Sequence, residues 1–190
     1  MRYALLLTRG FMKNKTYKVS SRKVIFSKGP IHLVDCDVRM PDGKVLSRQI
    51  IEHPGAVVIV PRYHKNKYVL IRQFRFAARD WLWEFPAGGI EKGENLRKAA
   101  ERELIEETEL RPRKLTKLFS FYPTPGISSE VMHLFLAEKL ESENCYEKDE
   151  DEDIEVAAFS FSEIEKMIRQ GKIADGKTLL SFYYLKLSGK

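Results

Sequence analysis

The alternation of apolar and polar positions predicts strands over residues 1 to about 50. Residues 31–40 and 44–52 are apolar-rich, and the turn signal Pro41-Asp42-Gly43 separates them, which predicts an antiparallel hairpin. A small sheet of this kind is marginally stable by itself, so we expect it to pack on the rest of the chain or on a second subunit. The next apolar run, Ala56–Val60, is continuous and is typical of a strand buried on both faces.

Downstream, the pattern predicts strands around one long helix, followed by two C-terminal helices. The strands are expected at about residues 68–74, 80–85, 115–122 and 131–139, with another beginning at 154–157. The long helix is expected from Leu96 to about Thr108. Glu follows both Ser160 and Ser162 after three positions, a capping-box signature for a helix over 161–170, and a last helix is expected over 176–187. This order indicates an α/β fold with α/β/α layering.

The long helix has carboxylates where core residues would be expected. Its apolar stripe consists of Leu96, Ala99, Ala100 and Leu104. Glu103 and Glu107 fall on the same side, with Glu106 at its edge, so three negative charges meet within one turn and oppose the helix by a few tenths of a kcal/mol per pair. They also lie near the helix C-terminus, where the macrodipole favours cations. Mg²⁺, which takes carboxylate oxygens and shares its remaining positions with phosphates, would explain the cluster.

A solvated acidic helix face is the usual meaning of a Glu-rich stretch. The residues before the helix argue against a solvated face here, because Pro86-Ala87-Gly88-Gly89 and Gly93 indicate a tight, ordered turn into the helix. A second acidic stretch, residues 147–155, is not preceded by glycine and proline residues of this kind. Its default interpretation is a solvated loop.

Composition restricts the class of protein without identifying it. The 190 residues are 43% apolar and 32% charged, with a net charge of +6 that suits an anionic ligand but is weak support for nucleic-acid binding, so no nucleic acid is expected. Tyr3–Leu7 is too short for a signal-peptide core, and no stretch approaches a membrane span. Cys36 and Cys145 do not suggest a disulfide framework, so a cytoplasmic location is expected.

The spacing around the helix resembles the box of the Nudix hydrolases, G-x5-E-x7-R-E-U-x-E-E-x-G-U, where U is aliphatic. The matching residues are Gly88, Glu94, Arg102, Glu103, Leu104, Glu106, Glu107 and Leu110. One position departs, because Glu109 stands where the family has Gly, which would suit a left-handed helix end. The resemblance implies a Nudix-type α/β/α sandwich with a mixed sheet at residues 53–190. An N-terminal antiparallel β-sheet at residues 1–52 would precede it.

Outside the box, the chain is similar to the ADP-ribose pyrophosphatase group of that family. The similarity lies in residues 48–57, 71–75, 84–88, 122–130 and 151–156. The resemblance implies Mg²⁺, which Mn²⁺ can replace, held by the Ala87 carbonyl, Glu103, Glu106 and Glu107. It implies catalytic roles for Glu106, Glu107 and Glu152. It also implies substrate binding by Arg48, Arg75, Glu84, Gly89 and Glu130, with Arg48 acting across a homodimer that exchanges its N-terminal sheets.

The expected activity is therefore Mg²⁺-dependent hydrolysis of the diphosphate bond of ADP-ribose, or of a related nucleoside-diphosphate sugar, to AMP and ribose 5-phosphate. Alternatives are a hydrolase of a GDP-sugar, a dinucleotide or an RNA cap, and a non-catalytic domain that binds ADP-ribose. The intact Glu103, Glu106 and Glu107 argue against the non-catalytic domain. The family has an adenine-stacking aromatic residue near position 30, where this chain has Pro30, Ile31 and His32. The sequence therefore does not indicate which nucleobase the substrate carries.

Overall fold

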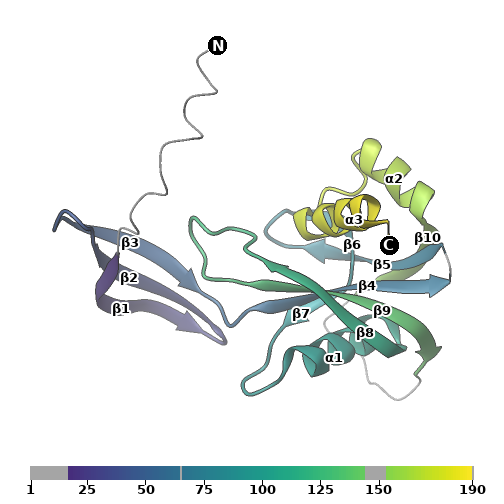
Figure 1. The fold of residues 1–190 in the computed structure, drawn as a ribbon, viewed down its shortest axis with the longest axis horizontal. Coiled ribbons are helices and arrows are strands. Elements are labelled where there is room, and N and C mark those ends of the chain that lie inside the picture. The colour runs from purple at the N-terminus through teal and green to yellow at the C-terminus, as the bar shows by residue number, and fades with distance from the viewer. Residues whose placement is uncertain (1–16, 65, 144–152, 190) are drawn as a thin grey trace, which may run out of the picture. The chain divides into compact units, whose positions relative to one another are not determined.

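The computed structural model describes residues 17–64, 66–143 and 153–189, and these form two compact units (Figure 1). The first unit takes in the chain up to His53 together with Gly126–Ser128. The second takes in Pro54–Pro125 and the chain from Ser129 onwards. The predicted residues Cys145 and Glu152 lie outside the described parts.

The first unit is a three-stranded antiparallel sheet. It contains β1 (Lys18–Lys28), β2 (Ile31–Arg39) and β3 (Val45–Glu52), in that spatial order. The β2–β3 hairpin predicted around Pro41-Asp42-Gly43 is confirmed, with Val38 opposite Leu46 and His32 opposite Glu52. Every residue of β1 is exposed, whereas Val34 and Cys36 of β2 are buried.

The second unit contains a mixed seven-stranded sheet. Its strands are β4 (Ala56–His64), β5 (Lys67–Arg75), β6 (Asp80–Glu84), β7 (Ala87–Gly89), β8 (Leu110–Phe121), β9 (Met132–Ser142) and β10 (Glu155–Ser160). The order is β10-β5-β4-β9-β8, with β6 beside β5 and β7 beside β4. The β4–β9 pair is parallel and the other pairs are antiparallel.

Helices cover both faces of this sheet, so the predicted α/β/α layering is confirmed (Figure 1). Successive residues of β4 point to opposite faces. Val57 and Ile59 pack with α1 (Leu96–Thr108), and Val58 and Val60 share a core cluster with residues of α2 (Phe161–Arg169) and α3 (Gly176–Ser188). All five residues of the predicted apolar run are buried, which confirms a strand covered on both sides.

The predicted helices form close to their expected bounds. Ser160 caps α2 in a capping box with Glu163, and Asp175 caps α3 by accepting the N–H of Thr178. The strand β8 begins five residues earlier than the pattern indicates, because the chain leaves α1 at Glu109 and enters the sheet directly at Leu110. None of the helices in the described ranges is long and apolar enough to cross a membrane.

Candidate functional site

The helix α1 is defined at both ends by local hydrogen bonds. Asn95 is its N-cap, with a side chain that accepts the N–H groups of Arg97 and Lys98 at 3.1 and 3.0 Å. At the other end Glu109 adopts the left-handed conformation, with φ of 58° and ψ of 28°, and donates its N–H to the Ile105 carbonyl. This conformation costs a non-glycine residue about 1–2 kcal/mol. Glu109 thus preserves the helix exit that the family's glycine would provide.

Three residues of α1 meet three consecutive residues of β7. Glu107 accepts the N–H of Ala87 at 3.0 Å. The Glu103 carboxylate lies against Gly88, so close that a Cβ at residue 88 would be 2.0 Å from Oε2. Arg102 Nη2 donates to the Gly89 carbonyl at 2.9 Å. The glycines of the box therefore allow the acidic face of the helix to lie directly on the strand.

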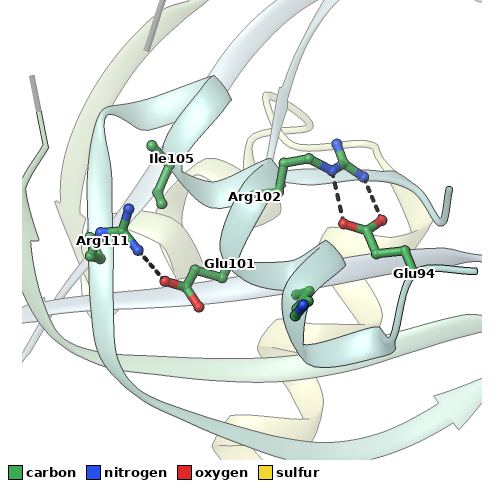
Figure 2. Close-up of a pocket in the computed structure, with 6 residues that line it drawn as sticks. Glu94, Glu101, Arg102, Ile105 and Arg111 are labelled. Atoms are coloured by element: carbon green, nitrogen blue, oxygen red, sulfur yellow. Dashed lines mark hydrogen bonds and ion pairs between the residues drawn. The ribbon is translucent and has the colours of Figure 1, made fainter. Parts of the chain in front are cut away.

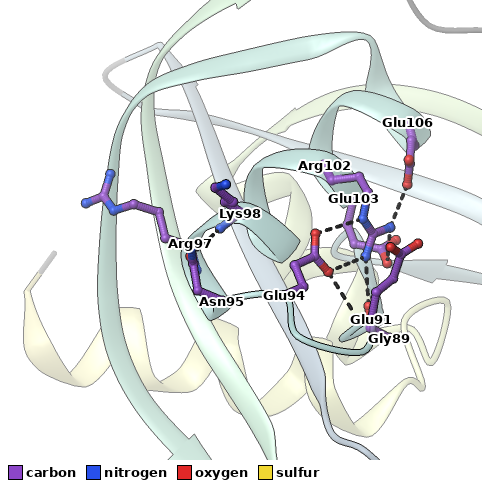
Figure 3. A network of polar contacts seen from close by, with 9 residues as sticks. All are labelled: Gly89, Glu91, Glu94, Asn95, Arg97, Lys98, Arg102, Glu103 and Glu106. Carbon is purple, nitrogen blue, oxygen red and sulfur yellow. Dashed lines mark hydrogen bonds and ion pairs between the residues drawn. The ribbon is translucent and has the colours of Figure 1, made fainter. Parts of the chain in front are cut away.

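Arg102 supplies a cation to the acidic cluster (Figure 3). Its Nη1 donates to Glu103 Oε1 and to Glu106 Oε2, both at 2.8 Å. Its Nε and Nη2 pair with Glu94 at 3.1 and 3.0 Å. The hydrogen bonds to Glu94 are the main reason why the pKa of Arg102 is raised. The helix pattern alone predicts carboxylates that repel one another unless a cation binds between them. In the structure, Arg102 of the same helix supplies a positive charge to Glu103 and Glu106.

The oxygen atoms of this cluster fit a hard divalent cation by their chemistry. Glu103 and Glu107 have side chains turned to β7, and the Ala87 carbonyl belongs to that strand, so carboxylate and carbonyl oxygens of two adjoining elements are available to Mg²⁺ or Mn²⁺. Among the residues that the structure describes, no three His, Cys, Asp or Glu side chains are already grouped as metal ligands. Arg102 bonds to one oxygen of each carboxylate, Glu103 Oε1 and Glu106 Oε2, and a carboxylate can bind an arginine and a cation together through its two oxygens.

A second polar cluster joins β5, β6 and α3. Arg75 makes a bidentate pair with Glu84, with Nε to Oε1 at 2.8 Å and Nη2 to Oε2 at 2.6 Å. Lys177 Nζ also contacts Glu84 Oε2. Burial raises the pKa of the Glu84 carboxyl, which is 1% exposed, but the bonds from Arg75 and the charge of Lys177 outweigh burial and hold the pKa below its usual value. Glu84 is therefore ionised at neutral pH.

The charge of Glu107 acts on Arg75. The pKa of Arg75 is raised, first by its bonds to Glu84 and further by the charges of Glu107 and Asp175. This electrostatic interaction links the second polar cluster to the acidic face of α1. The two clusters thus bring together carboxylates that suit a cation and an arginine that suits phosphate.

The remaining predicted residues are placed as follows. Arg48 is exposed on β3 in the first unit and donates to the Ser47 carbonyl at 2.9 Å. Glu130 is half-buried, two residues before β9 in the second unit. Glu152 lies outside the described residues, and the strand that follows it begins at Glu155. These placements leave the roles of all three as predictions.

Sequence reasoning missed Lys177. It lies 93 residues from Glu84, so no local spacing connects them. The only nearby signal is Asp175, a residue type that favours the N-cap of a helix, and it indicates no charge partner for the lysine. A polar cavity of about 290 Å³ beside α1 was also not expected (Figure 2). Its arginines, Arg102 and Arg111, are paired with Glu94 and Glu101, so this cavity is lined by ion pairs.

Comparisons with known proteins identify the family. The NUDIX domain profile matches residues 52–181. An ADP-ribose pyrophosphatase of Bacillus subtilis (strain 168) is 39% identical over 93% of this chain and 96% of its own length. A GDP-mannose pyrophosphatase of Escherichia coli O1:K1 / APEC is 35% identical over 83% of this chain and 88% of its own.

A solved structure supports the fold. It is described as the crystal structure of an ADP compounds hydrolase and is similar to this chain with a TM-score of 0.78, covering 95% of this chain and 99% of that one. Its sequence is 21% identical, so it bears on the fold alone. The profile match spans the box helix, the strand it lies on and the Arg75–Glu84 pair, and the chain belongs to the Nudix family.

Proposed function

We propose that this protein hydrolyses the diphosphate bond of ADP-ribose, releasing AMP and ribose 5-phosphate, with Mg²⁺ as its cation and Mn²⁺ able to substitute. The observation that carries the proposal is the placement of the α1 carboxylates on β7, within the electrostatic influence of Arg75. The 39% identity to an ADP-ribose pyrophosphatase over nearly the whole chain supports this substrate.

In this proposal the Ala87 carbonyl, Glu103 and Glu107 hold the cation, with Glu106 assisting. Glu106 suits an accessory role because its side chain is 36% exposed, whereas that of Glu103 is 12% exposed. A bound divalent cation neutralises the diphosphate and lowers the pKa of an attacking water. In the proposal Glu106 and Glu107 assist as catalytic carboxylates, and Glu152 would accept the proton of the attacking water.

The substrate contacts proposed are Arg48, Arg75, Gly89 and Glu130, with Glu84 supporting Arg75. The side chain of Arg75 is 38% exposed, so its guanidinium can reach the phosphates, whereas the side chain of Glu84 is 1% exposed. Gly89 is the last residue of β7, next to the cation ligands. Its lack of a side chain allows a substrate to approach the strand closely.

The working form proposed is a homodimer in which the N-terminal sheet, residues 1–52, serves the catalytic domain, residues 53–190, of the partner. The sheet of the first unit supports this, because β1 exposes Val19, Ile25 and Phe26 by 63, 49 and 60%. Exposed apolar residues on a three-stranded sheet are typical of an interaction surface. Arg48 would then act across the subunits.

A second candidate substrate is GDP-mannose. The similarity to a GDP-mannose pyrophosphatase, 35% identical over 83% of this chain, favours it. Dinucleotides and RNA caps carry the same diphosphate chemistry, and a domain that only binds ADP-ribose is the non-catalytic alternative. The carboxylates of Glu103, Glu106 and Glu107 argue against the last.

The test is a comparison of kcat/KM for ADP-ribose, GDP-mannose, a dinucleoside diphosphate and capped RNA, each with Mg²⁺. ADP-ribose is expected to exceed the others by at least about tenfold. The Glu107→Gln variant serves as the control for contaminating activity. A higher kcat/KM for another member of the panel would replace ADP-ribose as the substrate, and tight binding without turnover would support the non-catalytic alternative.

A further inference from the structure

A buried lysine at the start of α3 contacts a residue of the proposed substrate site. The side chain of Lys177 is 9% exposed, and its Nζ contacts Glu84 Oε2 and lies 3.1 Å from Asp175 Oδ1. Glu84 also receives both hydrogen bonds of Arg75. One buried carboxylate therefore lies between two cations, one from β5 and one from α3.

The helix α3 has other means of docking on the sheet. Thr178 accepts the N–H of Phe85 at 2.8 Å, and Phe182 and Leu185 are buried in the core. Replacing a buried ion pair by apolar residues is often neutral or stabilising. A need for helix packing alone therefore does not explain a buried lysine at residue 177, and the charge itself requires a reason.

The charges around Glu84 provide that reason. An arginine that binds phosphate must keep an available positive charge, but Glu84 alone would cancel the charge of Arg75. Lys177 adds a second cation to the same carboxylate. Asp175, on the other side of Lys177, caps α3 by accepting the N–H of Thr178, and its charge also pairs with Lys177. Two cations, Arg75 and Lys177, thus meet two carboxylates, Glu84 and Asp175, and without Lys177 the group would carry a net negative charge that opposes phosphate.

The three side chains differ in exposure in the order that this role requires. Glu84 is 1% exposed, Lys177 9% and Arg75 38%. The member open to solvent is therefore Arg75, and it is also the one whose pKa is raised by the charge of Glu107. Lys177 contacts Glu84 from a buried position, while Arg75 is the accessible member of the three.

We propose that Lys177 is a positioning residue for Arg75. It shares the Glu84 carboxylate, so the guanidinium stays fixed and the group does not become net negative where the phosphates of a nucleoside diphosphate bind. The inference rests on one part of the proposed function, the binding of phosphate by Arg75. Because Lys177 is proposed to affect binding of the diphosphate and not of the sugar, a ligand without the sugar can test it. ADP is therefore a sufficient probe.

The first experiment compares Lys177→Met, Lys177→Arg and Lys186→Met. Lys186 is the matched control, since it lies on the same helix and pairs with Glu165 at an exposed site. The Kd for ADP with Mg²⁺, measured by calorimetry, should rise about tenfold in Lys177→Met, as expected for a lost charge-assisted interaction. The KM for ADP-ribose should rise more than kcat falls. Lys177→Arg should recover most of the affinity, and Lys186→Met should match the wild type.

A double-mutant cycle with Glu84→Gln separates positioning from direct contact. Without the Glu84 charge, Arg75 needs no compensation, so adding Lys177→Met to Glu84→Gln should change the ADP affinity less than twofold. A cavity of about 400 Å³ borders Lys177 and Asp175, so direct contact with a ligand is physically possible. Direct contact would give the same tenfold loss in both backgrounds and would overturn the proposal.

Two further outcomes are decisive. A fall in Tm without a selective loss of ADP affinity in Lys177→Met would reduce Lys177 to a structural ion pair and overturn the proposal. If Lys177→Met does not fold, the comparison of Glu84→Gln with the double variant remains, because the double variant removes both members of the pair. Failure of the wild type to hydrolyse any nucleoside-diphosphate sugar would refute the proposed function, but the ADP affinities would still test Lys177.

Discussion

The carboxylate of Glu103 occupies the space that a side chain on Gly88 would fill. A Cβ at residue 88 would lie 2.0 Å from Oε2 and 2.3 Å from Oε1 of Glu103, far inside van der Waals distance. The requirement is one of space, since Gly88 does not have a positive φ. The acidic face of α1 can therefore lie on β7 because residue 88 has no side chain.

Gly88→Ala should displace the Glu103 carboxylate and lower kcat/KM by about 10²-fold, the cost of misplacing a group that must be positioned for the reaction. The protein should stay folded, because the carboxylate is at the end of a side chain that can rotate away. Steady-state kinetics and Tm test this. Gly126→Ala, where a Cβ meets nothing within 4 Å, is the control. Wild-type activity in Gly88→Ala would show that this position of Glu103 is not needed.

Chelation with EDTA should abolish hydrolysis, and Mg²⁺ or Mn²⁺ should restore it. The α1 helix should nevertheless persist in EDTA, because Arg102 bridges Glu103 and Glu106. Far-UV circular dichroism should therefore stay unchanged while activity is lost. Glu103→Gln or Glu107→Gln should lower kcat by orders of magnitude in a folded protein. Full activity in EDTA would contradict the proposed cation site.

The stability that Glu84 contributes should depend on pH. Its pKa in the folded protein lies below the ordinary value of 4.5, so the folded state favours the ionised form. This contribution is present above pH 4.5 and is lost as the pH falls through the lower folded pKa. The Tm difference between wild type and Glu84→Gln should therefore narrow as the pH falls below about 4.5. A Tm difference that stays constant over this fall in pH would contradict the prediction.

Glu152→Gln should lower kcat by about 10²- to 10⁴-fold, the usual contribution of a positioned general base. KM should change little, because the cation ligands of the box remain. Asp149→Asn and Asp151→Asn should have much smaller effects, since these residues belong to the same acidic stretch without the proposed role. Single-turnover rates of the three variants decide the matter. Equal, small effects would assign the stretch to solvated charge and the base to a box glutamate.

The protein should be a homodimer at micromolar concentration by light scattering. The exposed apolar residues of β1 require a surface to cover them, and the proposed exchange places Arg48 at the partner's site. Arg48→Ala should raise KM without dissociating the dimer. The exposed Arg22, which pairs with Glu52 within the same sheet, provides a control arginine. A fully active monomer would refute the role of Arg48 across subunits.

The elements of this fold whose signals are local could be predicted from the sequence. The bounds of α1, the β2–β3 hairpin, the capping box at Ser160 and the buried strand at Ala56–Val60 all follow from neighbours a few residues apart. The alignment of Glu103 and Glu107 on one helix side is local too. The sequence by itself therefore determined the helices, most strands and the acidic face of the candidate site.

Tertiary structure decided which groups meet that face. Gly88 and Glu103 come together because α1 lies on β7, and Lys177 reaches Glu84 across 93 residues because α3 packs at the end of β6. No spacing in the chain encodes such contacts, since they depend on how layers pack. Glu109 shows the same limit at short range. A residue that rarely adopts the left-handed conformation does so here because the chain must pass directly from α1 into β8, where packing outweighs local preference.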